Sequence, residues 1–161
     1  MKSADSIWIN APSNWVWQYV GALETWPRFY AKVGKGKCKQ VSPEGGVVGA
    51  LYDMEFEVRS WTLLCHYEIV DLRPGSMIAV KLTLDEKQEP MTRGWACQIV
   101  YELEDEGNRT RVTERVEATD WADFLFNWLG RFLAGLVYRF RQLAGRTNLQ
   151  RLKGLVEGTR G

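Results

Sequence analysis

The sequence predicts an α+β fold in which a curved antiparallel sheet wraps around a long C-terminal helix, with two short helices after the first strand. Two observations carry this prediction. Residues 35–118 alternate between apolar and polar side chains, and residues 124–140 form an apolar run with helical spacing. The chain has 161 residues, of which 45% are hydrophobic and 25% charged. This length and composition fit a single globular domain over residues 1–161.

The first part of the chain reads as a strand followed by two helical segments. The stretch "SIWIN" has the alternation of a short strand, and "APSNWVWQYVGAL" reads as a helix with Pro12 in its first turn. A shorter helical segment is expected around "WPRFYAKV". Residues 35–118 then alternate in a pattern that fits six strands. Turn signals break this alternation: "SPEGG" at 42–46, "RPGS" at 73–76, "DEKQEP" at 85–90 and "DEGN" at 105–108.

The apolar run "FLFNWLGRFLAGLVYRF", residues 124–140, reads as an amphipathic helix with a kink or break near residues 145–148. It is shorter than a membrane span and carries Asn127 and Arg131, so stable membrane insertion is not expected. Its apolar arc is wider than one sheet can cover, which predicts a homodimer or a second covering element. The residues that widen the arc are Phe126, Leu133 and Val137.

Charge, cysteine and histidine content exclude several classes of function. The formal net charge is +1, from 21 basic and 20 acidic residues, so no nucleic-acid partner is expected. The N-terminal "MKSADSIWIN" lacks the apolar run of a signal peptide, and the three cysteines lack CxxC spacing, so a cytoplasmic location with free thiols is expected. His66 is the only histidine, and no zinc-ligand spacing accompanies it, so neither a metal nor another cofactor is expected.

Five stretches of the chain, in order, resemble the SRPBCC superfamily and, within it, the polyketide cyclase/dehydrase-like branch. They are "IWINAPSNWVWQYV", "GGVVGALYDMEF", "YEIVDLRPGSMIAV", "TRVTERVE" and "TNLQRLKGLVEG". The resemblance covers nearly the whole chain and implies the helix-grip fold, in which the sheet and the C-terminal helix enclose a deep apolar cavity. The superfamily includes aromatase/cyclases, lipid and sterol carriers, ubiquinone-chaperone relatives and chaperone activators. No strict catalytic motif runs through them, so the resemblance transfers no catalytic residue.

Alternation along the strands predicts which side chains line that cavity. The expected ligand contacts are Tyr52, Met54, Cys65, Trp95 and Cys97 from the strands, and Trp128, Phe132 and Leu136 from the helix. Trp95 and Trp128 either stack on a flat ligand or serve as packing. The opposite parity gives a solvated outer face, which includes His66, Asp53, Glu55 and Glu57.

Two charged residues, Arg93 and Glu114, share the inward parity. A charge in an apolar chamber is costly unless it is paired or functional. Glu114 therefore acts as a general acid or base, or forms a buried ion pair with Arg93, or the register is shifted by one residue. Tyr52, Tyr67 and Tyr101 are candidate hydrogen-bond donors to a carbonyl or enolate, or core tyrosines with hydroxyls at the rim. The candidate catalytic set is Glu114, Tyr67, Tyr101 and Arg93.

These observations favour a cofactor-independent protein that binds a hydrophobic, polyketide-like or aromatic molecule and promotes its cyclisation or dehydration. The alternative is a non-catalytic carrier or sensor of a lipid, quinone or similar ligand. A protein-interaction module of the chaperone-activator type is a third hypothesis. Convergent polar groups inside the cavity favour an enzyme, whereas a cavity without them favours a carrier.

Overall fold

The computed structural model describes residues 2–30, 36–58, 61–84, 96–118 and 148–159. In this part of the chain a first strand precedes two short helices joined by a 3-10 turn, and six more strands and a C-terminal helix follow. The bounds are β1 Lys2–Ile9, α1 Ser13–Val20, η1 Leu23–Thr25, α2 Trp26–Phe29, β2 Gly36–Gln40, β3 Leu51–Val58, β4 Trp61–Arg73, β5 Met77–Leu84, β6 Ala96–Asp105 and β7 Thr110–Ala118. Residues 148–158 are helical. The predicted α+β order is confirmed.

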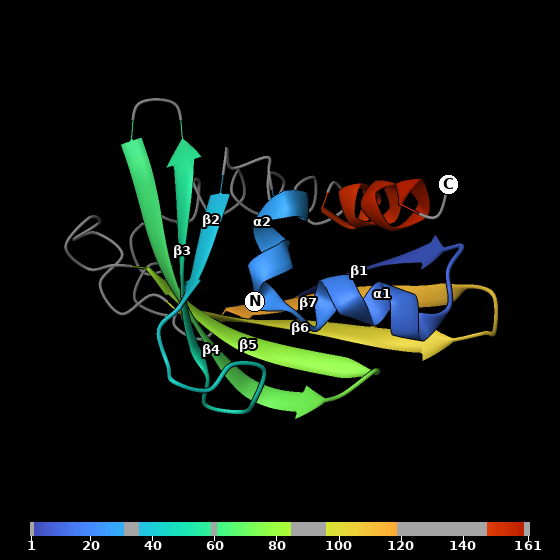
Figure 1. Ribbon diagram of the computed structural model, residues 1–161, viewed down its shortest axis with the longest axis horizontal. Helices are drawn as coiled ribbons and strands as arrows, with labels where there is room; N and C mark the ends of the chain where they lie inside the picture. Colours follow the sequence, from blue (N-terminus) through green and yellow to red (C-terminus); the bar gives the residue numbers. More distant parts are fainter. Residues whose placement is uncertain (1, 31–35, 59–60, 85–95, 119–147, 160–161) are drawn as a thin grey trace.

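The seven described strands form one antiparallel sheet with the order β1-β7-β6-β5-β4-β3-β2. The pairing of β4 with β5 shifts between Ile69 and Asp71, and such a bulge bends a sheet. Strands β2 and β3 accordingly stand steeply against β5, β6 and β7 (Figure 1). Helices α1 and α2 and the C-terminal helix lie on one side of this curved sheet (Figure 1). The sheet therefore has a concave face covered by helices and an outer face.

Helix α1 is bounded by a proline and a glycine. Pro12 has φ −65° and ψ 153°, an extended conformation that places it before the first helical residue. Val16 and Val20, four residues apart, are buried on the same side of the helix. Gly21 follows, and a Cβ atom there would lie 2.4 Å from Trp17 Cε2, so a larger residue would displace the indole ring. The prediction of a helix that starts before Pro12 and continues through "GAL" is therefore wrong at both ends.

Three of the predicted turns contain a glycine in the left-handed region, and the first is Gly46 of "SPEGG", with φ 66°. Gly75, in "RPGS", has φ 81° between β4 and β5, and Gly107, in "DEGN", has φ 77° between β6 and β7. Glycine has no Cβ atom and adopts this conformation without steric cost. These turn signals are confirmed, whereas "DEKQEP" lies outside the described residues.

The core lies between the concave face and the helices. Its helical contribution includes Val16, Trp26 and Phe29 at the N-terminal side and Leu152 and Val156 of the C-terminal helix. The apolar run of residues 124–140, the arc of Phe126, Leu133 and Val137, and the predicted kink near 145–148 fall outside the described residues, apart from Asn148. Within the described ranges, no helix has the length and apolar character needed to cross a membrane.

Candidate functional site

All of the predicted site residues that the structure describes face the concave side of the sheet and are buried there. They are Tyr52, Met54, Cys65, Tyr67, Cys97, Tyr101 and Glu114. Their inward direction, predicted from alternation alone, is confirmed, and the alternative of a one-residue shift at Glu114 is excluded. The other predicted site residues lie outside the described part of the chain: Arg93, Trp95, Trp128, Phe132 and Leu136. The predicted ion pair of Arg93 with Glu114 therefore stays a prediction.

Glu114 is the centre of a buried polar network. Its side chain on β7 lies directly across from Tyr101 on β6, and the residue is 4% exposed. The Tyr101 hydroxyl donates to Glu114 Oε1 over 2.7 Å, and the Tyr30 hydroxyl donates to the same oxygen over 2.9 Å. The two hydroxyl oxygens are 2.8 Å apart. Three oxygen atoms thus lie within hydrogen-bond distance of one another on the concave side.

The network has one more close contact than its two phenols have hydrogens. With Glu114 ionised, two hydroxyl hydrogens serve three short oxygen–oxygen contacts, because a carboxylate has none to donate. Burial, followed by the charge of Glu114, raises the pKa of Tyr30 and of Tyr101 well above the usual value, so both phenols keep their protons. A proton taken up by Glu114 would supply the hydrogen for the third contact. The geometry therefore suits a group that accepts a proton and returns it.

Tyr30 was not predicted as a site residue, and helix α2 puts it there. Trp26 stacks on Tyr30, with ring centroids 5.6 Å apart and an angle of 10° between the rings. The indole Nε1 of Trp26 donates to the Val20 carbonyl over 2.9 Å, and the same ring meets Tyr101 edge-on at 5.2 Å. The spacing of four residues between Trp26 and Tyr30 in "WPRFYAKV" was the available signal, since such residues share one side of a helix.

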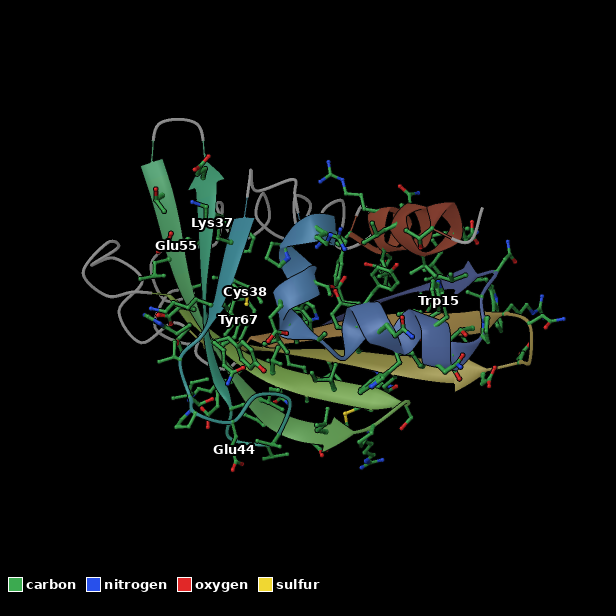
Figure 2. All side chains as sticks on the ribbon, in the orientation of Figure 1. Trp15, Lys37, Cys38, Glu44, Glu55 and Tyr67 are labelled. Atoms are coloured by element: carbon green, nitrogen blue, oxygen red, sulfur yellow. The ribbon has the colours of Figure 1, made fainter. Side chains whose placement is uncertain are left out.

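The cysteines of β2, β4 and β6 surround the Tyr67 ring on the concave face. Burial raises the pKa of Cys38 and of Cys65 to about 12, so both thiols stay protonated at neutral pH. Burial is also the main reason why the pKa of Tyr67 is raised well above its usual value, with smaller contributions from Cys65, Cys97 and Cys38. Cys38 and Tyr67 are both labelled in Figure 2. This part of the face is a neutral, polarisable wall.

Tyr52 marks the edge of the concave face. Its ring is buried, and its hydroxyl accepts a hydrogen bond from the backbone N–H of Gly46 over 2.8 Å. Gly46 belongs to the loop between β2 and β3 and has φ 66°. Tyr52 therefore behaves as the core tyrosine with its hydroxyl at the rim, whereas the Tyr101 hydroxyl lies inside the buried network.

Neither a family model nor a curated protein sequence matches the chain. Solved structures do match it. The protein CV1439 from Chromobacterium violaceum has 16% identity and a TM-score of 0.72, with 97% of this chain and 96% of that chain covered. Ara h 8.0201 has 10% identity and a TM-score of 0.70, with 98% of each chain covered. The ZhuI aromatase/cyclase from Streptomyces sp. R1128 has 13% identity and a TM-score of 0.65, with 98% and 93% covered. The chain has the Bet v 1-like helix-grip fold.

The structural neighbours with this helix-grip fold are Bet v 1-like, or SRPBCC, proteins, as the sequence resemblance implied. Two of these neighbours are described as aromatase/cyclases, whereas the names Ara h 8.0201 and ginseng major latex-like protein state no reaction. At these low identities the likeness establishes the fold alone. The choice between a catalytic function and non-catalytic ligand binding therefore depends on the polar groups of this chain.

The outer face of the helix-grip sheet carries a second polar pair that sequence analysis assigned to a solvated surface. His66 Nδ1 lies 2.7 Å from Asp53 Oδ1, and the two side chains are 44% and 36% exposed. The outward parity of both residues is confirmed, but their hydrogen bond was not predicted. Among the described residues no group of three or more histidine, cysteine or acidic side chains is arranged to hold a metal ion.

Proposed function

We propose that this protein binds a hydrophobic, polyketide-like or aromatic molecule on the concave side of its sheet and promotes its cyclisation or dehydration. The observation that carries the proposal is the buried network of Glu114, Tyr30 and Tyr101, with oxygen–oxygen distances of 2.7 to 2.9 Å. A carrier of hydrophobic ligands has no need for a nearly inaccessible carboxylate, since burial of a charge is costly. Three convergent polar groups in an otherwise apolar surface are typical of a reactive site.

The proposed chemistry begins with removal of a proton from a carbon beside a ketone. The Glu114 carboxylate is the base, and the resulting enolate carbon attacks a second carbonyl carbon of the same substrate. The phenols of Tyr30 and Tyr101 donate hydrogen bonds to the oxygen on which negative charge develops. The proton held by Glu114 then returns to the alkoxide, which becomes a hydroxyl group. For dehydration, Glu114 removes the second proton from the attacking carbon and delivers it to this hydroxyl group, which leaves as water while a carbon–carbon double bond forms. The apolar surroundings fold the substrate and exclude bulk water.

Aromatic side chains would hold the ring system of such a substrate next to this network. Trp26 and Tyr67 contact each other edge-on near the network, with ring centroids 6.0 Å apart. Flat ligands pack well against aromatic faces and edges. Tyr67 remains a candidate donor, because none of the described residues forms a hydrogen bond with its hydroxyl. The proposed ligand contacts of Met54, Cys65 and Cys97 belong to the same wall.

The test is the substitution Glu114→Gln, which keeps the size of the side chain but removes its ability to ionise. Turnover of a linear poly-β-ketone thioester should fall by about 10² or more, the usual scale for loss of a general base. The affinity for 1-anilinonaphthalene-8-sulfonate, a probe of hydrophobic sites, should change little. Glu57→Gln, on the outer face of β3, is the matched control and should leave both quantities unchanged.

A second variant separates the two roles within the network. Tyr30→Phe keeps the base but removes one donor to the developing negative charge, so turnover should fall by at least about tenfold. If the wild-type protein binds the poly-β-ketone and leaves it unchanged, the catalytic proposal is wrong and the carrier function stands. If Glu114→Gln cyclises the substrate at the wild-type rate, Glu114 is not the base.

A further inference from the structure

A groove on the outer face of β3, β4 and β5 gathers a second set of polar side chains. Its volume is about 400 Å³, within the usual range of small-molecule sites. Two rows of directly opposed residues form its floor: Asp53, His66 and Thr83 in the first row, and Leu51, Glu68 and Lys81 in the second. These side chains alternate with the buried residues of the concave face. Tyr52 and Tyr67, whose rings are buried on the concave face, also border the groove, whereas Glu114, Tyr30 and Tyr101 do not line it.

The hydrogen bond between His66 and Asp53 determines which nitrogen of the imidazole ring carries a hydrogen. His66 Nδ1 is 2.7 Å from Asp53 Oδ1, and a carboxylate has no hydrogen to donate. Nδ1 therefore carries a hydrogen, and in a neutral ring the lone pair is at Nε2, which faces away from Asp53. On the other side of His66 stands Thr83 of β5. His66 thus offers a hydrogen-bond acceptor to the groove.

Acceptors and donors in the groove are separated by strand. Strand β4 supplies two acceptors, His66 Nε2 and the Glu68 carboxylate, which are two residues apart and so share one face of the strand. Strand β5 supplies two donors, the Lys81 ammonium and the Thr83 hydroxyl, at the same spacing. Neighbouring strands lie about 4.8 Å apart. The floor of the groove thus presents hydrogen-bond acceptors on β4 beside hydrogen-bond donors on β5.

The charges in the groove favour one class of ligand. Glu68 and Lys81 lie directly opposite each other, yet no ion pair joins these two described side chains. With neutral His66, the two carboxylates and one ammonium give the groove a net charge of −1, which disfavours a simple anion. A ligand that carries both an ammonium and a carboxylate group complements the acceptors of β4 and the donors of β5. Since both groups of an α-amino acid are attached to one carbon, they can reach adjacent strands.

Two exposed apolar side chains also line the groove. Val41, in the loop after β2, is 52% exposed, and Leu51, at the start of β3, is 45% exposed. An apolar ligand side chain placed here would remove both from water. We propose that the groove binds a zwitterionic α-amino acid with an apolar side chain. Its ammonium group contacts Glu68 and His66, its carboxylate contacts Lys81 and Thr83, and its side chain packs on Val41 and Leu51.

The test uses L-phenylalanine and two analogues that each lack one charged group. Titration followed by nuclear magnetic resonance should show saturable binding of L-phenylalanine to β3, β4 and β5. Binding of 3-phenylpropionate, which lacks the ammonium group, and of 2-phenylethylamine, which lacks the carboxylate, should be at least about tenfold weaker, since each loses a charge-assisted hydrogen bond. Glu68→Gln and Lys81→Met should each weaken L-phenylalanine binding by a similar factor.

The matched controls come from the same outer face. Lys37 and Glu55 are also directly opposite each other, on β2 and β3, and lie outside the groove (Figure 2). Lys37→Met and Glu55→Gln should leave the affinity unchanged. Absence of saturable binding, equal binding of 3-phenylpropionate, or equal losses in the control variants would overturn the proposal. Glu114→Gln should not alter this binding, so the result is independent of the function proposed for the concave face.

Discussion

The two faces of β4 show how burial changes the use of the same kinds of polar group. On the concave face, Tyr67 and Cys65 are buried, and their pKa values are raised so that both stay protonated. On the outer face, His66 and Glu68 are half-buried and border an open groove. The carboxylates follow the same division, since Glu114 is 4% exposed and bonded to phenols, whereas the Asp53 side chain is 36% exposed and bonded to an imidazole.

This difference indicates separate tasks for the two faces. Water competes for the outer groups and weakens each interaction, so that face suits reversible binding of a charged ligand. On the concave face, the carboxylate and the phenols are buried and hydrogen-bonded to one another, which suits proton transfer in apolar surroundings. The variants below test this contrast by pairing a change on the concave side with a similar change outside.

The largest effect is expected from Trp26→Ala. This residue is fully buried and contacts Tyr30, Tyr67 and Tyr101, so its loss should lower the free energy of unfolding by about 3–5 kcal/mol. Trp8→Ala is the control, because Trp8 is only half-buried and carries Arg109 4.4 Å above its ring. It should cost about 1–2 kcal/mol in urea denaturation. Equal losses of unfolding free energy in Trp26→Ala and Trp8→Ala would contradict the contrast between the two faces.

A smaller effect is expected from Tyr101→Phe. The change removes one hydrogen-bond donor from a buried carboxylate, which should cost about 1–3 kcal/mol. Thr113→Val removes a hydroxyl of the outer face that lies 3.0 Å from Ser6 Oγ, and it should change the unfolding free energy by less than about 0.5 kcal/mol. A Tyr101→Phe protein as stable as the wild type would show that Glu114 does not depend on this phenol.

The most gradual effect is a loss of stability at alkaline pH. The pKa of Cys65 is raised from 9.0 to about 12 in the folded protein, so between these values the unfolded chain has lost the proton that the native state keeps. Stability from this thiol is complete below pH 9 and is lost as the pH rises toward 12, by at most about 1.4 kcal/mol per pH unit. Cys65→Ala should have a shallower decline in melts between pH 8 and 10.5. An unchanged slope would mean that Cys65 ionises as easily when folded.

Much of the fold follows from local patterns. Alternation placed Tyr52, Tyr67, Tyr101 and Glu114 on one face, because a strand repeats every two residues and turn glycines fixed where each strand ends. The bounds of α1 were less accessible, because the extended ψ of Pro12 and the contact of Gly21 with Trp17 depend on packing. A proline near the start of a helix does not reveal whether it precedes the helix or belongs to the first helical turn.

The site was less predictable than the fold, because its contacts join distant segments. Tyr30 follows α2, and the packing of Trp26 and Phe29 against Tyr101 of β6 brings it within 2.9 Å of Glu114, 84 residues later. The Asp53–His66 pair depends on the register of β3 against β4, which alternation within each strand does not specify. The alternation along each strand therefore predicted which face of the sheet a residue occupies, but not which residue it bonds with.

The most direct test of the concave site is ¹³C nuclear magnetic resonance of protein labelled at tyrosine Cζ, titrated with 1,8-dihydroxyanthraquinone as an aromatic polyketide mimic. Phenylalanine substitutions assign each signal. Tyr19 is the internal control, because its hydroxyl lies 2.9 Å from Thr159 Oγ1 in an exposed contact away from Glu114. We predict that the Tyr30 and Tyr101 signals shift with saturation while the Tyr19 signal stays in place. Saturable binding that leaves Tyr30 and Tyr101 unchanged would contradict a ligand site at Glu114.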